Sequence, residues 1–151
     1  MRIDLIKGNT SEIARISGEE VKTKGVDASR VKKNLKEMAR QLAQKRHGTV
    51  VVTGKEDIVT DGFSLYIIKN GHPLMGRIVG TGCMATSMIG TFAAVEPDLA
   101  LAAAAALVTF GIAAEVAAQA SLGPGTFKEK MYDSLFHLNR KTLDRMQKVE
   151  G

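Results

Sequence analysis

The segment Gly80-Thr81-Gly82-Cys83 has the clearest potential for chemistry, because it follows an extended stretch and directly precedes a helix-forming one. Two glycines allow a tight turn in which successive backbone N–H groups converge on one point. The following helix adds its own N-terminal donors and the positive end of its dipole. These residues predict a site for an anion such as a transferring phosphoryl group, although simple turns share the pattern.

Cys83 stands at the start of the predicted helix. A helix N-terminus favours the thiolate form of cysteine. If Cys83 faces a cleft, its sulfur can take the proton from a substrate alcohol during phosphoryl transfer. The alternative is a small buried residue that only packs at the helix start.

A second polar group follows a short apolar run near the N-terminus. Asn9 and Glu12 lie three residues apart at a predicted helix start, close enough to share a magnesium ion or its waters. Lys7, just before them, can meet a phosphate. The same spacing also suits a capping box, in which both side chains satisfy free backbone donors. Both interpretations stay open.

A third candidate is Thr53, which with Gly54 ends the β-branched run from Thr49. Such a run is typical of a central strand, and open α/β sheets bind ligands beyond the carboxyl ends of their strands. Thr53 can therefore bond a phosphate, or it can cap the last turn of the strand. The three histidines lie far apart in sequence and show no ligand spacing, so we expect no histidine metal site.

The elements that must position these groups alternate strand and helix in the first half of the chain. We expect a strand at 3–7 and a helix from about Glu12, capped by Thr10 or Ser11. An amphipathic helix should open at Asp27 or Ser29 and stop at His47-Gly48, followed by a central strand at 49–53.

The second half begins with an expected antiparallel meander at 58–60 and 63–68, closed by the tight-turn dipeptide Asn70-Gly71. Helices should follow at 84–95 and 98–121, then a loop at 123–125. A final helix should carry Phe127, Met131, Leu135, Leu138 and Met146 inward. With no repeat or dividing linker, residues 1–151 predict one layered α/β domain.

The composition argues against a nucleic-acid-binding, membrane-spanning or exported protein. The formal net charge is +5, but much of the basic excess forms the solvated face of the amphipathic helix and lacks aromatic residues that would stack on bases, so we expect no nucleic-acid partner. The alanine-rich stretch from Leu99 to Ala120 contains Glu115 and Gln119, which favours a buried helix over a membrane span. A single cysteine and no signal peptide indicate a cytoplasmic protein.

The order and spacing of these motifs resemble the hydroxyethylthiazole kinase family. The resemblance runs from about Ile3 to Leu138 and rests on Lys-Gly-Asn-x-Ser-Glu, Val-Thr-Gly-x-x-Asp, Asn-Gly-His-Pro, Gly-Thr-Gly-Cys and Gly-Pro-Gly-x-Phe. It implies the C-terminal portion of a ribokinase-like three-layer α/β/α fold. It also implies transfer of the γ-phosphoryl group of ATP to the hydroxyl of 4-methyl-5-(2-hydroxyethyl)thiazole in thiamine biosynthesis or salvage, with Mg²⁺.

The same resemblance implies roles for individual residues. Lys7 and Thr53 match ATP-contacting positions, although many relatives have arginine at the position of Lys7. Gly80 matches a glycine at the thiazole site, and Asn9 and Glu12 match a magnesium-associated pair. The four residues of Gly80-Thr81-Gly82-Cys83 match the anion hole, with Cys83 at the position of the base.

Members of this family are about twice as long, and their N-terminal half supplies the first strands and much of the thiazole pocket. They assemble as trimers with sites between subunits. We therefore expect this chain to work as a homo-oligomer or with a missing N-terminal half. The alternative is a truncated, non-catalytic nucleotide-binding or assembly subunit.

Overall fold

The computed structural model describes residues 3–18 and 28–151, and the side chains of all of these except 28–33. The chain divides into two compact units. The first runs to Ile67 and includes Gly151, and the second is Ile68–Glu150. The single domain predicted over 1–151 remains a prediction.

A sheet forms the centre of the first unit. Its strands lie in the order β1 (Leu5–Asn9), β2 (Thr49–Thr53), β3 (Asp57–Thr60) and β4 (Leu65–Ile68). β1 is parallel to β2, and β2 is antiparallel to β3. The predicted strand at 49–53 is confirmed, and Val50, Val51 and Val52 are buried as a central strand requires. The two strands expected in the meander are present as neighbours in the sheet and start at Asp57 and Leu65.

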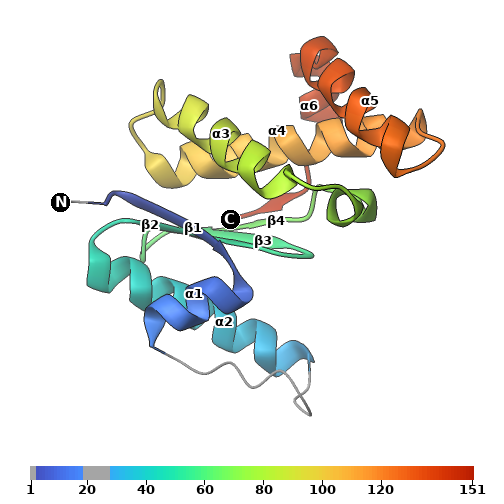
Figure 1. The fold of residues 1–151 in the computed structure, drawn as a ribbon. Coiled ribbons are helices and arrows are strands. Elements are labelled where there is room, and N and C mark those ends of the chain that lie inside the picture. The colour runs from blue at the N-terminus through green and yellow to red at the C-terminus, as the bar shows by residue number, and fades with distance from the viewer. Residues whose placement is uncertain (1–2, 19–27) are drawn as a thin grey trace. The chain divides into compact units, whose positions relative to one another are not determined.

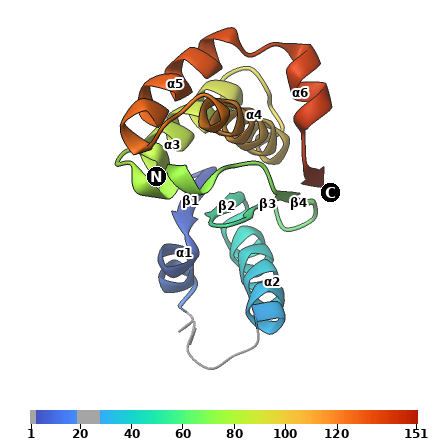
Figure 2. The ribbon, with the colours of Figure 1, turned by 90° about the vertical axis from the view of Figure 1, so that its right-hand side faces the viewer.

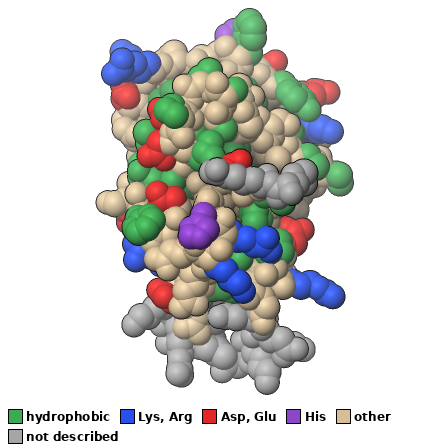
Figure 3. Space-filling model, turned by 90° about the vertical axis from the view of Figure 1, so that its left-hand side faces the viewer, with side chains coloured by type: hydrophobic (Ala, Val, Ile, Leu, Met, Phe, Trp, Pro, Cys, Tyr) green, Lys and Arg blue, Asp and Glu red, His purple; other side chains and the backbone are tan. Residues whose placement is uncertain are grey.

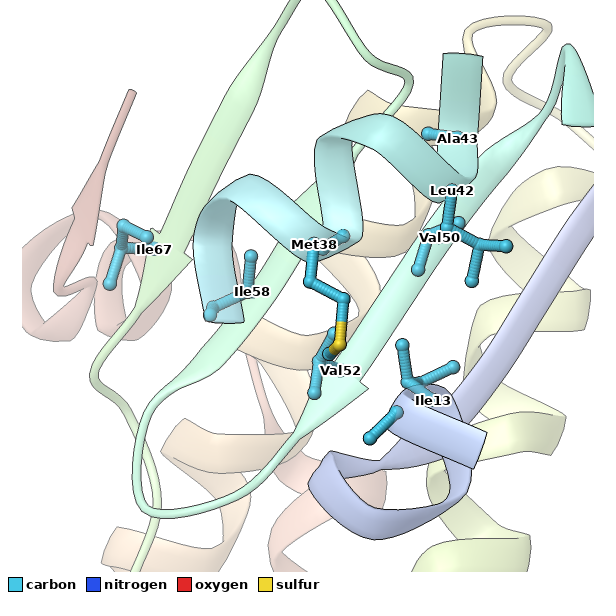
Figure 4. Packing of buried hydrophobic residues seen from close by; sticks show 10 residues of the cluster. Ile13, Met38, Leu42, Ala43, Val50, Val52, Ile58 and Ile67 are labelled. Atoms are coloured by element: carbon cyan, nitrogen blue, oxygen red, sulfur yellow. The ribbon is translucent and has the colours of Figure 1, made fainter. Parts of the chain in front are cut away.

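Helices α1 (Thr10–Ser17) and α2 (Ala28–Arg46) cover one face of this sheet (Figure 1). Figure 4 shows Met38 of α2 beside Val52 of β2, with Ile13 of α1 close by. Together with Leu42 and Val50 these side chains belong to the hydrophobic core of the unit. The apolar spacing of α2, read from the sequence, thus marks the face that packs on the sheet.

The ends of α1 and α2 differ in detail from the predictions. Asn9 caps α1, so the helix starts at Thr10, before the expected Glu12. The end of α2 is confirmed, because His47 leaves the helix with a positive φ of 52°. Ser29 lies inside α2, which begins at Ala28, and Asp27 lies outside the described residues.

The second unit is built around α4 (Leu99–Gln119), which packs against α3 (Thr81–Ala93), α5 (Pro124–His137) and α6 (Arg140–Met146) (Figures 1 and 2). Asp98 caps α4 by accepting from the N–H groups of Ala100 and Leu101, both at 3.0 Å. In the described part of the chain, α4 is the one helix long and apolar enough to span a membrane, yet most of it is buried inside the protein. That burial fits the predicted interior helix.

Three predictions for the second unit are wrong. Asn70-Gly71 does not close a hairpin but leads into a 3₁₀ helix, η1 (Pro73–Arg77). The expected loop at 123–125 is mostly helix, because Pro124 takes the first position of α5. The expected last helix is two helices, since Leu138 is extended and Asn139 caps α6 by accepting from the N–H of Thr142 at 3.1 Å.

The residues predicted to face inward in the last part of the chain are buried or partly buried. Phe127 and Met131 are buried as predicted, and Leu135, Leu138 and Met146 are partly buried. A short unpredicted strand, β5 (Val149–Glu150), follows α6.

Several large apolar side chains remain exposed, among them Val79, Leu122 and Phe136. On the face drawn in Figure 3, hydrophobic side chains are scattered among charged ones rather than gathered in one continuous patch. Isolated apolar side chains are common on protein surfaces. Their exposure alone therefore identifies no docking partner.

Candidate functional site

In the first unit, the carboxyl ends of β1 and β2 bring predicted site residues together. Asn9 and Thr53 are register partners in the parallel pair, and the Thr53 hydroxyl donates a long hydrogen bond of 3.4 Å to the carbonyl of Gly8. Parallel strands in open α/β sheets place their ligands at this edge. Asn9 and Thr53, two separate candidates in the sequence, are therefore neighbours in the structure.

Lys7 lies two residues before Asn9 on the same strand. Side chains alternate across a strand, and Ile6 packs into the core beneath α1 and α2. Lys7 therefore belongs to the opposite sheet face, where its positive charge acts on the carboxyl group of Asp57. This places a cation beside the strand ends that carry Asn9 and Thr53.

Asn9 and Glu12 form a capping box at the start of α1. The N–H of Glu12 donates to Asn9 Oδ1 at 3.0 Å, and the N–H of Asn9 donates to Glu12 Oε2 at 2.7 Å. The capping interpretation left open by the sequence is therefore confirmed. A side chain on Gly8 would interfere, because its Cβ would lie 3.0 Å from Glu12 Cβ and 3.2 Å from Glu12 Oε2.

The capping box does not exclude a metal role. Mg²⁺ is usually held by one or two carboxylates together with phosphates and waters, so it needs no dense cage of protein ligands. Among the described residues no group of three or more His, Cys, Asp or Glu side chains could hold a metal ion. Glu12 and Asn9 are exposed side chains with oxygen atoms at the carboxyl end of β1, and such a donor set fits a water-rich magnesium ion.

Asp57 is a residue to which the sequence analysis gave no role. Its Oδ1 accepts the backbone N–H of Gly54 at 2.9 Å, which fixes the turn directly after Thr53. Burial raises the pKa of Asp57 to about 6, against the opposing effects of that hydrogen bond and of Lys7. The sequence pattern Thr-Gly-x-x-Asp indicates this hydrogen bond, because an aspartate close to a turn glycine often bonds the local backbone.

In the second unit, Gly80 turns the chain into α3. Its φ of 103° lies in the left-handed region that favours glycine, and no side chain caps the helix there. The helix begins at Thr81 rather than at the expected Met84, and its first bond runs from the N–H of Met84 to the carbonyl of Gly80 at 2.9 Å. The predicted loop is thus shorter, and most of it is the first helical turn.

Thr81, Gly82 and Cys83 occupy that first turn of α3. N–H groups in the first turn of a helix have no carbonyl partner within the helix, and the dipole is positive there. Cys83 is exposed, which contradicts the alternative of a buried packing residue. The arrangement places the positive end of the helix dipole and an accessible thiol directly after the Gly80 turn.

Thr81 also ties this turn to the preceding segment. Its hydroxyl donates to the carbonyl of Met75 in η1 at 3.0 Å. Further along α3, the hydroxyls of Thr86 and Ser87 bond back to the carbonyls of Gly82 and Cys83 at 3.0 and 3.2 Å. The start of α3 is therefore held by side chains as well as by its own backbone.

The predicted site residues thus fall into two groups. Lys7, Asn9, Glu12 and Thr53 belong to the first unit, and residues Gly80 to Cys83 belong to the second. Each group is local, held by short-range hydrogen bonds that the structure describes.

Known proteins resemble the chain along nearly its whole length. The model of the hydroxyethylthiazole kinase family matches residues 1–141. Hydroxyethylthiazole kinases of Methanosarcina mazei and Methanosarcina acetivorans are each 49% identical to it over 150 residues, covering 99% of this chain and 58% of each relative. The chain therefore spans little more than half the length of these relatives.

The fold agrees with this match. A solved structure of a hydroxyethylthiazole kinase protein from Pyrococcus horikoshii OT3 superposes with a TM-score of 0.87 at 37% identity, covering 98% of this chain and 54% of that one. The predicted ribokinase-like α/β fold is confirmed. On its sequence motifs, its fold and the match over residues 1–141, the chain belongs to the hydroxyethylthiazole kinase family.

Proposed function

We propose that this chain supplies the nucleotide-binding and phosphoryl-transfer elements of a kinase that phosphorylates 4-methyl-5-(2-hydroxyethyl)thiazole with ATP. The observation that carries the proposal is the left-handed turn at Gly80, followed at once by the first turn of α3 with an exposed Cys83. A helix start with flexible glycines suits the charge that develops on a transferring phosphoryl group. The thiazole is proposed as the substrate because the chain belongs to the hydroxyethylthiazole kinase family.

The first unit is assigned to ATP. Lys7 meets the phosphates as a cation, and the Thr53 hydroxyl donates to a phosphate oxygen. Asn9 and Glu12 hold Mg²⁺ through their oxygen atoms or through its waters. Bound magnesium supplies positive charge that offsets the charge of the phosphate oxygens.

The second unit is assigned to the reacting groups. The sulfur of Cys83 takes the proton of the substrate hydroxyl, and the alcohol oxygen forms a bond to the γ-phosphorus. The bond from that phosphorus to the bridging oxygen of ADP breaks, so the products are the thiazole phosphate and ADP. Thr81 and Gly82 stabilise the charge on the transferred group from the positive end of the α3 dipole, and Gly80 leaves room for the thiazole.

Family membership also supports a proposal for the cellular role and the oligomeric state. We propose a cytoplasmic, thiamine-related role and a homo-oligomer, a trimer in which neighbouring chains help to complete the sites. A non-catalytic nucleotide-binding or assembly subunit is the competing proposal, since the chain spans only 58% of its Methanosarcina relatives.

A chimera separates these proposals. The matching segment of the Methanosarcina mazei relative is replaced by this chain, and phosphorylated thiazole is measured with ATP and Mg²⁺. Turnover that depends on Cys83 supports the kinase proposal. A folded chimera that binds ATP without turnover favours the non-catalytic subunit. A Lys55→Ala chimera, altered at an exposed lysine outside the assigned residues, is the matched control.

A further inference from the structure

Glu115 is a nearly buried carboxylate on the apolar helix α4, with 13% of its side chain exposed. Its Oε1 accepts from the Nδ2 of Asn70 at 3.1 Å and from the backbone N–H of Gly71 at 3.0 Å. Its Oε2 accepts from the Nζ of Lys148 at 2.8 Å. A charge in such a helix costs free energy unless it is well bonded, and here three donors satisfy it.

Asn70, which donates to Glu115, also bonds the segment after α6. Its Nδ2 also donates to the carbonyl of Met146 at 2.9 Å, and its Oδ1 accepts from the N–H of Lys148 at 2.7 Å. Asn70, Gly71, Glu115, Met146 and Lys148 together form what we term the Glu115 clasp. It joins the segment after β4, helix α4 and the segment after α6.

Gly111, one turn before Glu115, shows how closely the clasp is packed. A Cβ at this position would lie 2.7 Å from the backbone carbon and oxygen of Asn70. Only glycine allows the chain at Asn70 to lie this close to α4. The segment after β4 is therefore held against the helix by both shape and hydrogen bonds.

The clasp lies at one end of a braced connection to α3. Directly after Gly71, His72 caps η1 by accepting the N–H of Leu74 at 3.3 Å, and its carbonyl accepts from the N–H of Met75 at 3.0 Å. The carbonyl of Met75 then accepts the hydroxyl of Thr81 at 3.0 Å. Each hydrogen-bonded step leads from Glu115 toward the first turn of α3.

We propose that Glu115 is a positioning residue that sets the Gly80–Cys83 turn through Gly71, η1 and Thr81. This inference rests on the proposed function, because it gives the turn a task in phosphoryl transfer. Glu115 lies on α4, its described hydrogen bonds go to Asn70, Gly71 and Lys148, and it acts on the turn through the elements between them. Displacement of reacting groups by small amounts is costly in transfer reactions, so a brace at this place affects rate.

The ionisation of Glu115 agrees with this role. Burial raises the pKa of the carboxyl group, but hydrogen bonds from Lys148, Gly71 and Asn70 outweigh burial and hold the pKa below its usual value. The side chain is therefore a carboxylate at neutral pH. Charge-assisted bonds from Gly71 and Asn70 are stronger than neutral ones.

Four variants of the chain separate positioning from general stability. Glu115→Ala leaves the donors of Asn70 and Gly71 without their acceptor, whereas Glu115→Gln keeps an oxygen for both. Lys148→Met removes the ion pair alone. Asp98→Ala, which removes the cap at the far end of α4, is the control for loss of stability without a change in the clasp.

Amide hydrogen exchange measured by NMR on the chain reads the brace directly. In Glu115→Ala, exchange at Gly71, Met75 and Met84 should rise by about tenfold or more, as expected when buried donors lose an acceptor. Lys148→Met should stay near wild type at these amides, whereas Glu115→Gln should lie between wild type and Glu115→Ala, because its neutral oxygen accepts from both donors without charge assistance. Asp98→Ala should speed exchange mainly at Ala100 and Leu101. Wild-type exchange at Met75 and Met84 in Glu115→Ala would overturn the proposal.

Kinetics of the same variants in the chimera give a second readout. We expect Glu115→Ala to lower kcat by about tenfold with little change in the KM for ATP, and Glu115→Gln to recover part of kcat. A rise of about tenfold in the KM for ATP with unchanged kcat would contradict the proposal that Glu115 positions the turn. If the unmodified chimera is inactive, the proposed function fails, while the exchange experiment still decides the role of Glu115.

Discussion

Asp57 and Gly54 are joined by a hydrogen bond of 2.9 Å from the backbone N–H of the glycine to a carboxylate oxygen. The bond closes the turn at the carboxyl end of β2, next to Thr53. The hydrogen bond favours the ionised form of Asp57. Burial has the larger effect and raises the pKa of Asp57 from 3.8 to about 6. The charged side chain is therefore held at the strand end at a cost in stability, as is common at functional sites.

This cost has a defined pH dependence. Between about pH 4 and pH 6 the unfolded chain has lost the Asp57 proton while the folded chain still holds it, so the contribution of Asp57 to stability falls as pH rises and then levels off. The total is up to about 3 kcal/mol, since one pKa unit corresponds to about 1.36 kcal/mol.

Asp57→Asn should abolish this contribution, because the amide oxygen still accepts from Gly54 but does not titrate. We expect urea denaturation to show the variant gaining stability over wild type as pH rises from 4 to 7. A difference between the two proteins that is constant across this range would contradict the raised pKa.

Gly8→Ala tests the support of Glu12. The added Cβ would lie 3.0 Å from Glu12 Cβ and 3.2 Å from Ile13 Cδ1, so Glu12 must shift and the capping box weakens. The expected loss is about 1 to 2 kcal/mol in unfolding free energy, with weaker binding of Mg²⁺-ATP by calorimetry. Gly90→Ala is the control, because nothing lies within 4 Å of its Cβ position and alanine favours the helix. Equal effects of both changes would rule out the steric argument.

Cys83→Ala tests the proposed base in the chimera. A lost general base lowers kcat by roughly 10²-fold, whereas the KM for ATP should change little because Lys7 and Thr53 are assigned to the nucleotide. Steady-state rates with the thiazole as acceptor check both values. Wild-type turnover in the alanine variant would leave Cys83 without a role in proton transfer.

The chain by itself should bind ATP weakly and fail to phosphorylate the thiazole. The residues assigned to the nucleotide are present, but the relatives from which the thiazole substrate is inferred are nearly twice as long as this chain. Among the described strands β1 pairs with β2 alone, so an open edge should promote self-association. Calorimetry with ATP, a phosphorylation assay and sedimentation measure the three outcomes. Clear turnover by a monomer would show that the rest of the relatives' sequence is dispensable.

Strong local patterns made part of the fold predictable from the sequence. The run from Thr49 to Thr53 is β-branched and bounded by glycines, and α4 begins at an aspartate cap and is predominantly apolar. The break between α5 and α6 was missed, because Leu135, Leu138 and Met146 continue an inward pattern across it. The cap formed by Asn139 interrupts the helix there, and single-residue caps carry little weight in a periodicity argument.

The candidate site was predictable where a motif is compact. The capping box and the Gly80 turn use neighbours within a few residues, so their geometry follows from short spacing. Asp57 and Glu115 escaped assignment for a different reason. Their roles depend on burial and on partners such as Asn70, 45 residues away from Glu115, which only the folded chain brings together.

The alanines of α4 have a consequence for how the second unit responds to temperature. Most of the buried residues of this helix are alanines, which lose no side-chain rotamer freedom on folding. They also expose little apolar surface on unfolding, and it is that surface which sets the heat capacity change. The stability curve of this unit should therefore be shallow, with its free energy of unfolding changing less per degree than in a unit whose core is built from leucine and phenylalanine.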